Sequence, residues 1–598
     1  MSGFSSSFWG AVVGVLVGFF ISLAALFVFG FILFGIVASG LEQKAFSPEV
    51  EKGTFLHLKL SGAIPDKPIQ NTFKKIWTSF QGEDVLSLPE LLEVIYDAKD
   101  NPDIKGIFLD NIQLSTGWAT LEELRQALVD FRTSGKPILA YADWLDQANY
   151  YLASLSDRLF LNPSGSVAHI GLTAQFISFK GMLDKLGIKA QVIRPDSNAF
   201  KSAAESFIYE KMSPENRLQL KALVASMWTH ITASIADTRK TSPDSVRAWA
   251  NRLDGLDPEL AYRKGLVDGL RYYDQIVDTL KILTGTGKEP PRLILASDYF
   301  KRLNKVKAKK DKKIVILFAE GEIVDENGSN DENKIVGARY AELLRKARAD
   351  ENVKGIVLRV NSPGGSALAS DLIHREVILT RAVKPVYVSM GNRAASGGYY
   401  ISCGADSIFA DYNTITGSIG VFGLLPDLSE LLNQKLGIRR DTVSTEKFSD
   451  SFTLGKPLTK EEFSIFKKTV ERVYQRFLEH VARGRRMTWV QVRRLAQGRV
   501  WGGSDALQVG LVDRLTGLQG VVTSLKRTLG SDNVHLEYWP SEEDFWKRFF
   551  GKNVISDIFF RQLFSQFSSP PEGSLQILDY EALLKTKIWA RAPEIQVF

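Results

Sequence analysis

The sequence predicts an α/β protein that contains two copies of one domain behind a single N-terminal transmembrane helix. Three observations carry this prediction. Short apolar runs such as Lys313 to Ala319 alternate with helically spaced segments such as Ser370 to Thr380, which is typical of a largely parallel sheet with crossover helices. Similar stretches of sequence recur in the two halves of the chain, and a long segment near the N-terminus carries no charge.

The duplication rests on five pairs of similar stretches at a nearly constant separation. Residues 101–109 (NPDIKGIFL) match 351–358 (ENVKGIVL), and residues 156–172 match 405–421; the other pairs are Tyr150-Tyr151 with Tyr399-Tyr400, 186–188 with 436–438, and 265–268 with 510–513. Most pairs lie 249 residues apart. We therefore expect an anchor in residues 1–45, a first repeat in 46–290, a Lys-rich linker in 291–312, a second repeat in 313–530 and an aromatic-rich extension in 531–598.

The N-terminal segment from Phe8 to Ala38 contains no charged residue. As a helix it exceeds the ~30 Å hydrocarbon core of a bilayer, which indicates an uncleaved signal anchor. A removed signal peptide is the alternative, because Ala38, Ser39 and Gly40 are small. Gly10, Gly14 and Gly18 would lie on one face of such a helix. They could form a surface for packing against another helix, or they could reflect only how common glycine is in membrane helices. The flanking charges do not set the orientation.

Composition excludes several classes of protein. The chain has 598 residues, of which 44% are hydrophobic and 24% charged, and its net charge of +7 is too dilute to indicate nucleic-acid binding. Its single cysteine, Cys403, excludes an intramolecular disulfide and a cysteine-rich metal site. No two of the six histidines stand three or four residues apart, so we expect no metal ligand among them.

Two glycine-rich motifs follow predicted strands in the second half. Residues 361–366 (NSPGGS) contain Gly364 and Gly365, whose backbone N–H groups no Cβ would shield. Residues 392–400 (NRAASGGYY) contain Ser396 among small residues at a predicted strand-to-helix turn. Such a turn exposes a nucleophilic hydroxyl, and the helix N-terminus favours an oxyanion. The alternative for Ser396 is a tight helix–sheet packing position without chemistry.

These motifs, followed by residues 416–423 (TGSIGVFG), resemble the signal peptide peptidase A (protease IV) family, serine peptidase family S49, in its long, duplicated form. The resemblance extends from Thr54 to about Leu529 and implies two crotonase/Clp-peptidase-like domains. In long members a lysine base lies in a motif like YKSAxExF. Residues 200–207 (FKSAAESF) match it and assign that role to Lys201, with Phe200 in place of the usual tyrosine.

The duplication gives an independent argument for the pair Ser396 and Lys201. The first-half counterpart of Ser396 is Gln147, so that half lacks the nucleophile. The second-half counterpart of Lys201 is Asp450 or Ser451, although Lys447 is near. Each half therefore keeps what the other has lost, and we expect one composite site between them.

The implied mechanism is acyl-enzyme hydrolysis with no metal or organic cofactor. A lysine with its ordinary pKa near 10.4 is charged at neutral pH, so Lys201 must be desolvated to accept the proton of Ser396. We expect N–H groups at Gly364, Gly365 and Gly397 to hold the oxyanion. Ser418 would orient the lysine, or would simply be a turn serine.

The resemblance further implies peptide substrates, namely cleaved signal peptides, and a membrane-anchored homo-oligomer, a tetramer in the long form. The expected location is the bacterial inner membrane, single-pass, with the catalytic part in the periplasm; a cytosolic orientation is the alternative. Two other functions stay open from the residues alone. One is a crotonase-type acyl-CoA enzyme, and the other is a non-catalytic membrane scaffold derived from a protease.

Overall fold

The computed structural model describes residues 50–68, 86–306, 312–325, 334–451, 455–540 and 588–591, together with Gly18, Phe19, Ser22 and Leu26. The chain forms two compact units, Met1–Val50 and Glu51–Phe598. The predicted anchor from Phe8 to Ala38 thus lies almost entirely outside the described residues. Within the residues that are described, no helix is both long and apolar enough to cross a membrane.

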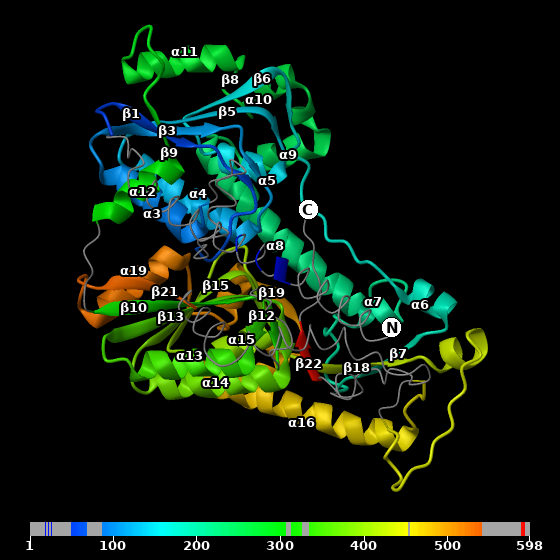
Figure 1. The fold of residues 1–598 in the computed structure, drawn as a ribbon. Coiled ribbons are helices and arrows are strands. Elements are labelled where there is room, and N and C mark those ends of the chain that lie inside the picture. Colours follow the sequence, from blue (N-terminus) through cyan, green and yellow to red (C-terminus); the bar gives the residue numbers. More distant parts are fainter. Residues whose placement is uncertain are drawn as a thin grey trace, which may run out of the picture. The chain divides into compact units, whose positions relative to one another are not determined.

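The first half of the second unit contains a six-stranded parallel sheet, which confirms the predicted α/β class (Figure 1). Its strands in spatial order are β9 (Leu293–Leu295), β1 (Thr54–Leu58), β3 (Ile104–Asp110), β5 (Ile138–Leu145), β6 (Arg158–Val167) and β8 (Gly269–Leu270). The helices of this half are α3 (Leu88–Asp100), α4 (Trp118–Arg132), α5 (Gln147–Ala153), α6 (Lys180–Leu186), α7 (Glu205–Ile208), α8 (Pro214–Thr238), α9 (Pro243–Arg252), α10 (Pro258–Lys264), α11 (Tyr273–Thr284) and α12 (Ala296–Val306). Two short strands, β2 (Ser61–Gly62) and β4 (Gln113–Leu114), pair separately.

The second half repeats this strand order. Its sheet contains β21 (His535–Trp539), β10 (Lys313–Glu320), β13 (Val353–Ser362), β15 (Val386–Ala395), β16 (Ser407–Ala410) and β20 (Arg514–Leu515) in spatial order. Two further strands, β17 (Ile415–Gly417) and β19 (Val500–Gly502), extend it beyond β15. The helices are α13 (Gly337–Ala349), α14 (Ala367–Arg381), α15 (Gly397–Ser402), α16 (Lys460–Arg485), α17 (Trp489–Leu495), α18 (Gly503–Gln508) and α19 (Leu518–Leu529). The matched topologies agree with the sequence repeats.

Strand β10 shows why the strands of this half have continuous apolar sequences. Val315, Leu317 and Ala319 pack into the core beneath α13 and α14, while Ile314 and Ile316 pack against α19 on the other face. A parallel strand covered by helices on both faces must be apolar at nearly every position. Burial on both faces therefore explains the continuous apolar run of the strand that leads toward the site.

A third sheet joins the two halves. Its order is β12 (Lys334–Val336), β11 (Glu322–Val324), β14 (Gly364–Ser366), β22 (Ile588–Arg591), β18 (Phe422–Asp427) and β7 (Lys189–Ile193). Strand β7 comes from the first half and pairs antiparallel with β18 of the second. Strand β22 pairs antiparallel with both β14 and β18. The two repeats thus share one hydrogen-bonded sheet.

Two segments differ from the expected domain limits. Residues 293–306, which the sequence assigns to the linker, form β9 and α12 at the edge of the first sheet. Residues 535–539, which it assigns to the extension, form β21 at the equivalent edge of the second sheet. Each repeat therefore ends in an edge strand that the composition of the chain did not reveal.

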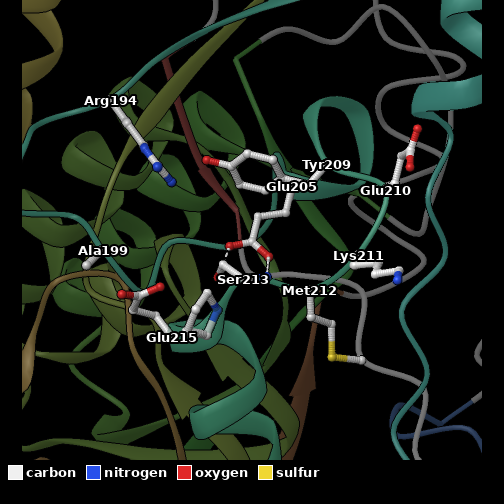
Figure 2. A pocket seen from close by; sticks show the side chains of 10 residues that line it. Arg194, Ala199, Glu205, Tyr209, Glu210, Lys211, Met212, Ser213 and Glu215 are labelled. Atoms are coloured by element: carbon white, nitrogen blue, oxygen red, sulfur yellow. Dashed lines mark hydrogen bonds between the residues drawn. The ribbon is translucent and has the colours of Figure 1, made fainter.

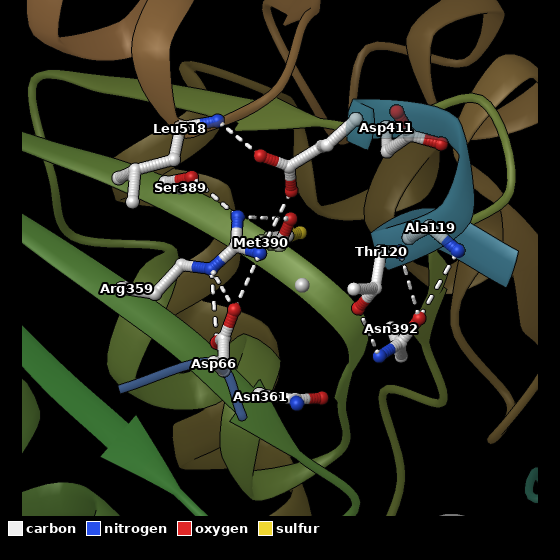
Figure 3. A network of polar contacts seen from close by, with 12 residues as sticks. Asp66, Ala119, Thr120, Arg359, Asn361, Ser389, Met390, Asn392, Asp411 and Leu518 are labelled. Carbon is white, nitrogen blue, oxygen red and sulfur yellow. Dashed lines mark hydrogen bonds and ion pairs between the residues drawn. The ribbon is translucent and has the colours of Figure 1, made fainter. Parts of the chain in front are cut away.

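A buried ion network also ties the halves together (Figure 3). Arg359 on β13 is fully buried and forms ion pairs with Asp66 at 2.8 Å and Glu123 at 2.7 Å, both from the first half. Glu123 Oε2 also accepts a hydrogen bond from Leu518 N at 2.7 Å. Burial alone would lower the pKa of the Arg359 guanidinium, but the two carboxylates raise it well above its usual value. The guanidinium is therefore a permanent charge between two buried acids.

We predict that Arg359→Met lowers the free energy of unfolding by ~3–5 kcal/mol, because it leaves two buried carboxylates without a cation. Chemical denaturation measures the change. The control is Arg132→Met, which breaks the partly exposed pair with Asp157 and should cost at most ~1 kcal/mol. Equal losses in the two variants would contradict a stabilising role for the buried network.

Candidate active site

Ser396 lies at the sharp turn between β15 and α15. Its backbone has φ 56° and ψ −113°, a conformation that a non-glycine residue rarely adopts and that surrounding contacts must hold. Ser396 N donates to Gly417 O at 2.8 Å, and a Cβ at Gly398 would lie 2.8 Å from Ser362 O. Small residues after Ser396 are therefore needed for α15 to pack close to β13.

Lys201 reaches the same place from the first half. Phe200 N donates to Gln497 O at 3.0 Å, which attaches the lysine segment to the second half. Gly498 has φ +78°, and a Cβ there would lie 2.5 Å from Lys201 Cβ, so only glycine lets the segment approach this closely. Lys201 is 1% exposed, an unusual burial for a lysine.

The ε-amino group contacts two serines. Lys201 Nζ lies 2.7 Å from Ser396 Oγ and 3.1 Å from both the carbonyl oxygen and Oγ of Ser418. Burial lowers the pKa of Lys201 well below its ordinary value. A neutral amine has two N–H donors and one lone pair. When both donors go to Ser418, the lone pair faces the hydroxyl of Ser396 and can accept its proton.

Ser418 is itself fixed by the second half. Its φ is +49°, and its N–H donates to Arg499 O at 2.6 Å. Arg499 directly precedes β19, which pairs with β17 just before Ser418. Ser418 therefore presents both its carbonyl and its hydroxyl to the amine from a rigid turn.

The three glycines expected near an oxyanion take different positions. Gly364 N donates to Ser362 Oγ at 3.1 Å, so this N–H already has a partner. Gly365 has φ +154° and lies so close to β11 that a Cβ would be 2.0 Å from Ile323 O. Gly397 is the first residue of α15, where backbone N–H groups lack helical partners. All three lie on the elements that surround Ser396.

The equivalent positions in the first half hold a different arrangement. Gln147 Nε2 lies 3.0 Å from His169 Nδ1, and Gln147 Oε1 accepts from Ile170 N and Gly171 N, both at 2.9 Å. Gln147 and His169 are the sequence counterparts of Ser396 and Ser418. Burial lowers the pKa of His169 to about 4, so the ring is neutral at physiological pH. These positions in the first half therefore form a buried hydrogen-bond network.

The counterpart of Lys201 in the second half also lacks a buried base. Asp450 forms an ion pair with Lys456 at 2.8 Å, and Lys447 pairs with the exposed Glu461. Both lysines are surface groups. Only one of the two equivalent places therefore combines a serine with a desolvated amine.

A pocket of about 610 Å³ lies beside the lysine segment (Figure 2). Its lining includes Arg194, Ala199, Glu205, Tyr209 and Glu215, but neither Lys201 nor Ser396. Figure 2 shows the Glu205 carboxylate turned toward Ser213, whose Oγ donates to it at 2.6 Å. The pocket marks the outer side of the segment that carries Lys201. In the described part of the chain no group of three acidic, histidine or cysteine residues could hold a metal ion.

Sequence reasoning did not single out several residues that shape the site, among them Asn198, Gln219 and Gly498. Asn198 Nδ2 donates to Val421 O at 2.9 Å, across the two halves. Nothing in the sequence distinguishes Gly498 from the other glycines among the 47 in the chain. Its contact with Lys201 joins residues almost 300 positions apart. Their importance comes from proximity to Lys201 in the folded chain.

Comparison with known proteins gives a consistent family. The model of peptidase family S49 matches residues 130–286 and 378–531, which together cover more than half of the chain and fall once in each half. The chain is 37% identical to Protease 4 of Haemophilus influenzae and 35% identical to Protease 4 of Salmonella typhi. These alignments cover 84% and 83% of this chain and 81% of each relative.

Shorter proteins match one part of the chain. A putative signal peptide peptidase SppA of Enterococcus faecium is 36% identical over 41% of this chain and 72% of its own length. Among solved structures, a ClpP1 mutant from Listeria monocytogenes is 17% identical and gives a TM-score of 0.24, covering 35% of this chain and 94% of that one.

The burial of Lys201 predicts a pH-dependent stability. Between its lowered native pKa and its ordinary unfolded pKa near 10.4, the unfolded chain binds a proton that the native protein does not. Lys201 therefore destabilises the native protein at neutral pH, and this penalty fades as the pH rises toward 10.4. We expect Lys201→Met to raise the Tm at pH 7, with a gain that shrinks by pH 10. Calorimetry over this range measures it.

The matched control is Lys467→Met, which removes a surface lysine paired with the exposed Asp196 and should give no comparable pH-dependent gain. A Tm difference between wild type and Lys201→Met that stays constant from pH 7 to pH 10 would mean that Lys201 is charged in the native protein.

Proposed function

The chain belongs to peptidase family S49 and is a serine protease, and from this premise we propose that Ser396 is its nucleophile and Lys201 its general base. The observation that carries the proposal is the 2.7 Å contact between Lys201 Nζ and Ser396 Oγ, two side chains that are both buried. The family favours peptide-bond hydrolysis over the acyl-CoA enzyme and the inactive scaffold. The active site would be composite, with one group from each repeat.

In the proposed reaction, Lys201 Nζ takes the hydroxyl proton as Ser396 Oγ bonds to the carbonyl carbon of the substrate. The resulting ammonium keeps hydrogen bonds to Ser418 O and Oγ, which stabilise its new charge. The C–N bond then breaks, the ammonium gives its proton to the leaving amine, and an ester to Ser396 remains. Water deprotonated by Lys201 attacks the ester and releases the acid with a free serine.

We propose that the N-terminus of α15 stabilises the oxyanion through the N–H of Gly397, with Gly364 and Gly365 on the opposite side. Preorganised N–H donors at such a place are worth ~2.7–4 kcal/mol each in related chemistry. Gly364 N is bonded to Ser362 Oγ in the free protein. That N–H would therefore have to exchange the hydroxyl for the oxyanion when substrate binds.

Peptide substrates would bind as a strand between β14 and β18, in the place that β22 occupies in the structure, so β22 would have to leave it first. Both strands adjoin the site, because β14 begins two residues after Ser362 and β18 begins four residues after Ser418. The chain's own β22 supports this mode, since it pairs antiparallel with β14 through Gly364 to Ser366 and with β18 through Phe422 and Gly423. Main-chain pairing accepts many sequences, which suits a protease that degrades varied apolar peptides.

We further propose that the protein is a single-pass, membrane-anchored homo-oligomer, a tetramer, that degrades cleaved signal peptides at the bacterial inner membrane. Support for the anchor comes from the uncharged segment Phe8 to Ala38. Support for signal peptides comes from the similarity to a relative named for them. An anchored enzyme would meet such apolar fragments where they remain after preprotein processing, and its second unit would face the periplasm.

The activity test uses Ser396→Ala, Lys201→Ala and the double variant with an apolar peptide substrate. Each single change should lower kcat/KM by about 10⁴-fold or more, and the double variant should lose little beyond that, since both groups act in one step. Steady-state hydrolysis and acylation by a serine-directed probe measure this. An active Lys201→Ala variant that is folded and oligomeric would show that the base lies elsewhere.

The orientation test exploits the single cysteine. Cys403 is fully buried, so it gives no background with a thiol reagent that cannot cross membranes. Val443 is fully exposed, and Val443→Cys should be labelled at the outer face of spheroplasts if the second unit is periplasmic. Labelling only after the membrane is opened would place this unit in the cytosol.

A further inference from the structure

Gln219 contacts both neighbours of Lys201. It lies on α8, is 1% exposed, and its Nε2 donates to Ser202 Oγ at 2.9 Å and to Phe200 O at 3.2 Å. Phe200 and Ser202 directly flank Lys201 in the chain. A single side-chain amide therefore contacts the main-chain carbonyl before the proposed base and the side-chain hydroxyl after it.

The other end of the same amide reaches the second half. Gln219 Oε1 accepts a hydrogen bond from Val500 N at 3.1 Å. Val500 lies opposite Gly417 in the pairing of β19 with β17, and its neighbour Arg499 holds Ser418 N at 2.6 Å. Gly417 O in turn accepts from Ser396 N. Gln219 thus links the lysine segment to the strand pair that positions both serines.

The helix that carries Gln219 is fixed at its start. Ser213 caps α8 by accepting from Asn216 N at 3.1 Å, and Glu205 accepts from Ser213 Oγ at 2.6 Å and from Asn216 Nδ2 at 2.9 Å. This cap connects α8 back to the segment just after Lys201 (Figure 2). Asn216 Oδ1 lies 3.1 Å from Gln219 Nε2, which orients the amide.

The second repeat lacks this arrangement. Its equivalent helix, α16, is capped by Thr459, and the residue at the same distance from the cap as Gln219 is Ile465. Ile465 is 44% exposed. The buried amide is therefore found in the repeat that carries the buried lysine and is replaced by an exposed apolar residue in the repeat that does not.

We propose that Gln219 is a positioning residue that sets the place of Lys201 Nζ between Ser396 and Ser418. The inference rests on the proposed function, because it assumes that Lys201 transfers the proton. A lysine side chain has four rotatable bonds, so its tip is placed only as well as its main chain is held. A displacement of ~1 Å at a reacting group can cost ~100-fold in rate.

The charged groups around Lys201 determine how a change at Gln219 should affect the pKa of the lysine. The charged groups near the lysine segment include Glu205, which is bonded to Ser213 and Asn216, and Arg499, which lies over the rings of Phe200 and Trp501. Arg194 and Glu215 line the neighbouring pocket. The hydrogen bonds of Nζ go to Ser396 and Ser418 and not to these groups, so desolvation decides the charge of the amine. A loosened segment would admit water, and the pKa of Lys201 would rise toward its ordinary value.

The test compares Gln219→Met, which has similar length but no hydrogen-bonding group, with Thr232→Val on the same helix. Thr232 is buried and bonds only to carbonyl groups within α8, so its variant controls for general damage to the helix. We expect Gln219→Met to lower kcat about 10- to 100-fold per titrated active site, leave KM within about twofold, and move the acidic limb of the pH–rate profile to higher pH. Thr232→Val should keep the wild-type kcat and pH profile.

Three outcomes separate the hypotheses. If Gln219→Met only lowers the Tm and the fraction of protein that reacts with a serine-directed probe, while kcat per site and the acidic limb stay unchanged, Gln219 is structural and the inference is wrong. A rise in KM with unchanged kcat would also overturn it. If Lys201→Ala itself remains active, the proposed function fails first, whatever Gln219 does.

Discussion

The ε-amino group of Lys201 is buried, and the other features of the site depend on this burial. A solvated lysine would be protonated at neutral pH and could not accept a hydrogen bond from Ser396. The first half could not bury the amine alone, because Gly498, which lies against Lys201, and the two serines that contact its Nζ belong to the second half. The shared sheet of β7 with β18 and the Arg359 network keep these surfaces together.

The two repeats illustrate how one fold can hold two different hydrogen-bond arrangements at equivalent positions. In the first repeat, Gln147 and His169 satisfy each other and two backbone N–H groups. In the second repeat, Ser396 and Ser418 share a partner that only the other repeat supplies. The duplication thus allowed one copy to become a support for the other, since a buried hydrogen-bond network stabilises its surroundings when every member has a partner.

Local signals in the sequence were sufficient for much of this architecture. The apolar run at β10 and the helical spacing at α14 predicted their elements, because burial on both sides of a sheet leaves a clear pattern. The repeat comparison pointed to Lys201 and Ser396 as a pair. The sequence could not reveal the contacts of Gln219, the pairing of β7 with β18 or the partners of Arg359, since each joins positions hundreds of residues apart. The Lys-rich segment was misleading because Lys301 of α12 is exposed while its neighbours Tyr299 and Phe300 are buried.

The division of the site between repeats has a consequence for biosynthesis. The first repeat, with Lys201, emerges from the ribosome long before Ser396 or Gly498 has been made. Domains generally begin to fold as they emerge. During that interval the nascent chain holds the proposed base without the proposed nucleophile, and Gly498 does not yet lie against the lysine. A truncated product that ends before Gly498 would lack one of the residues that lie against Lys201. If the proposed site is correct, synthesis order alone delays peptidase activity until nearly the whole chain exists.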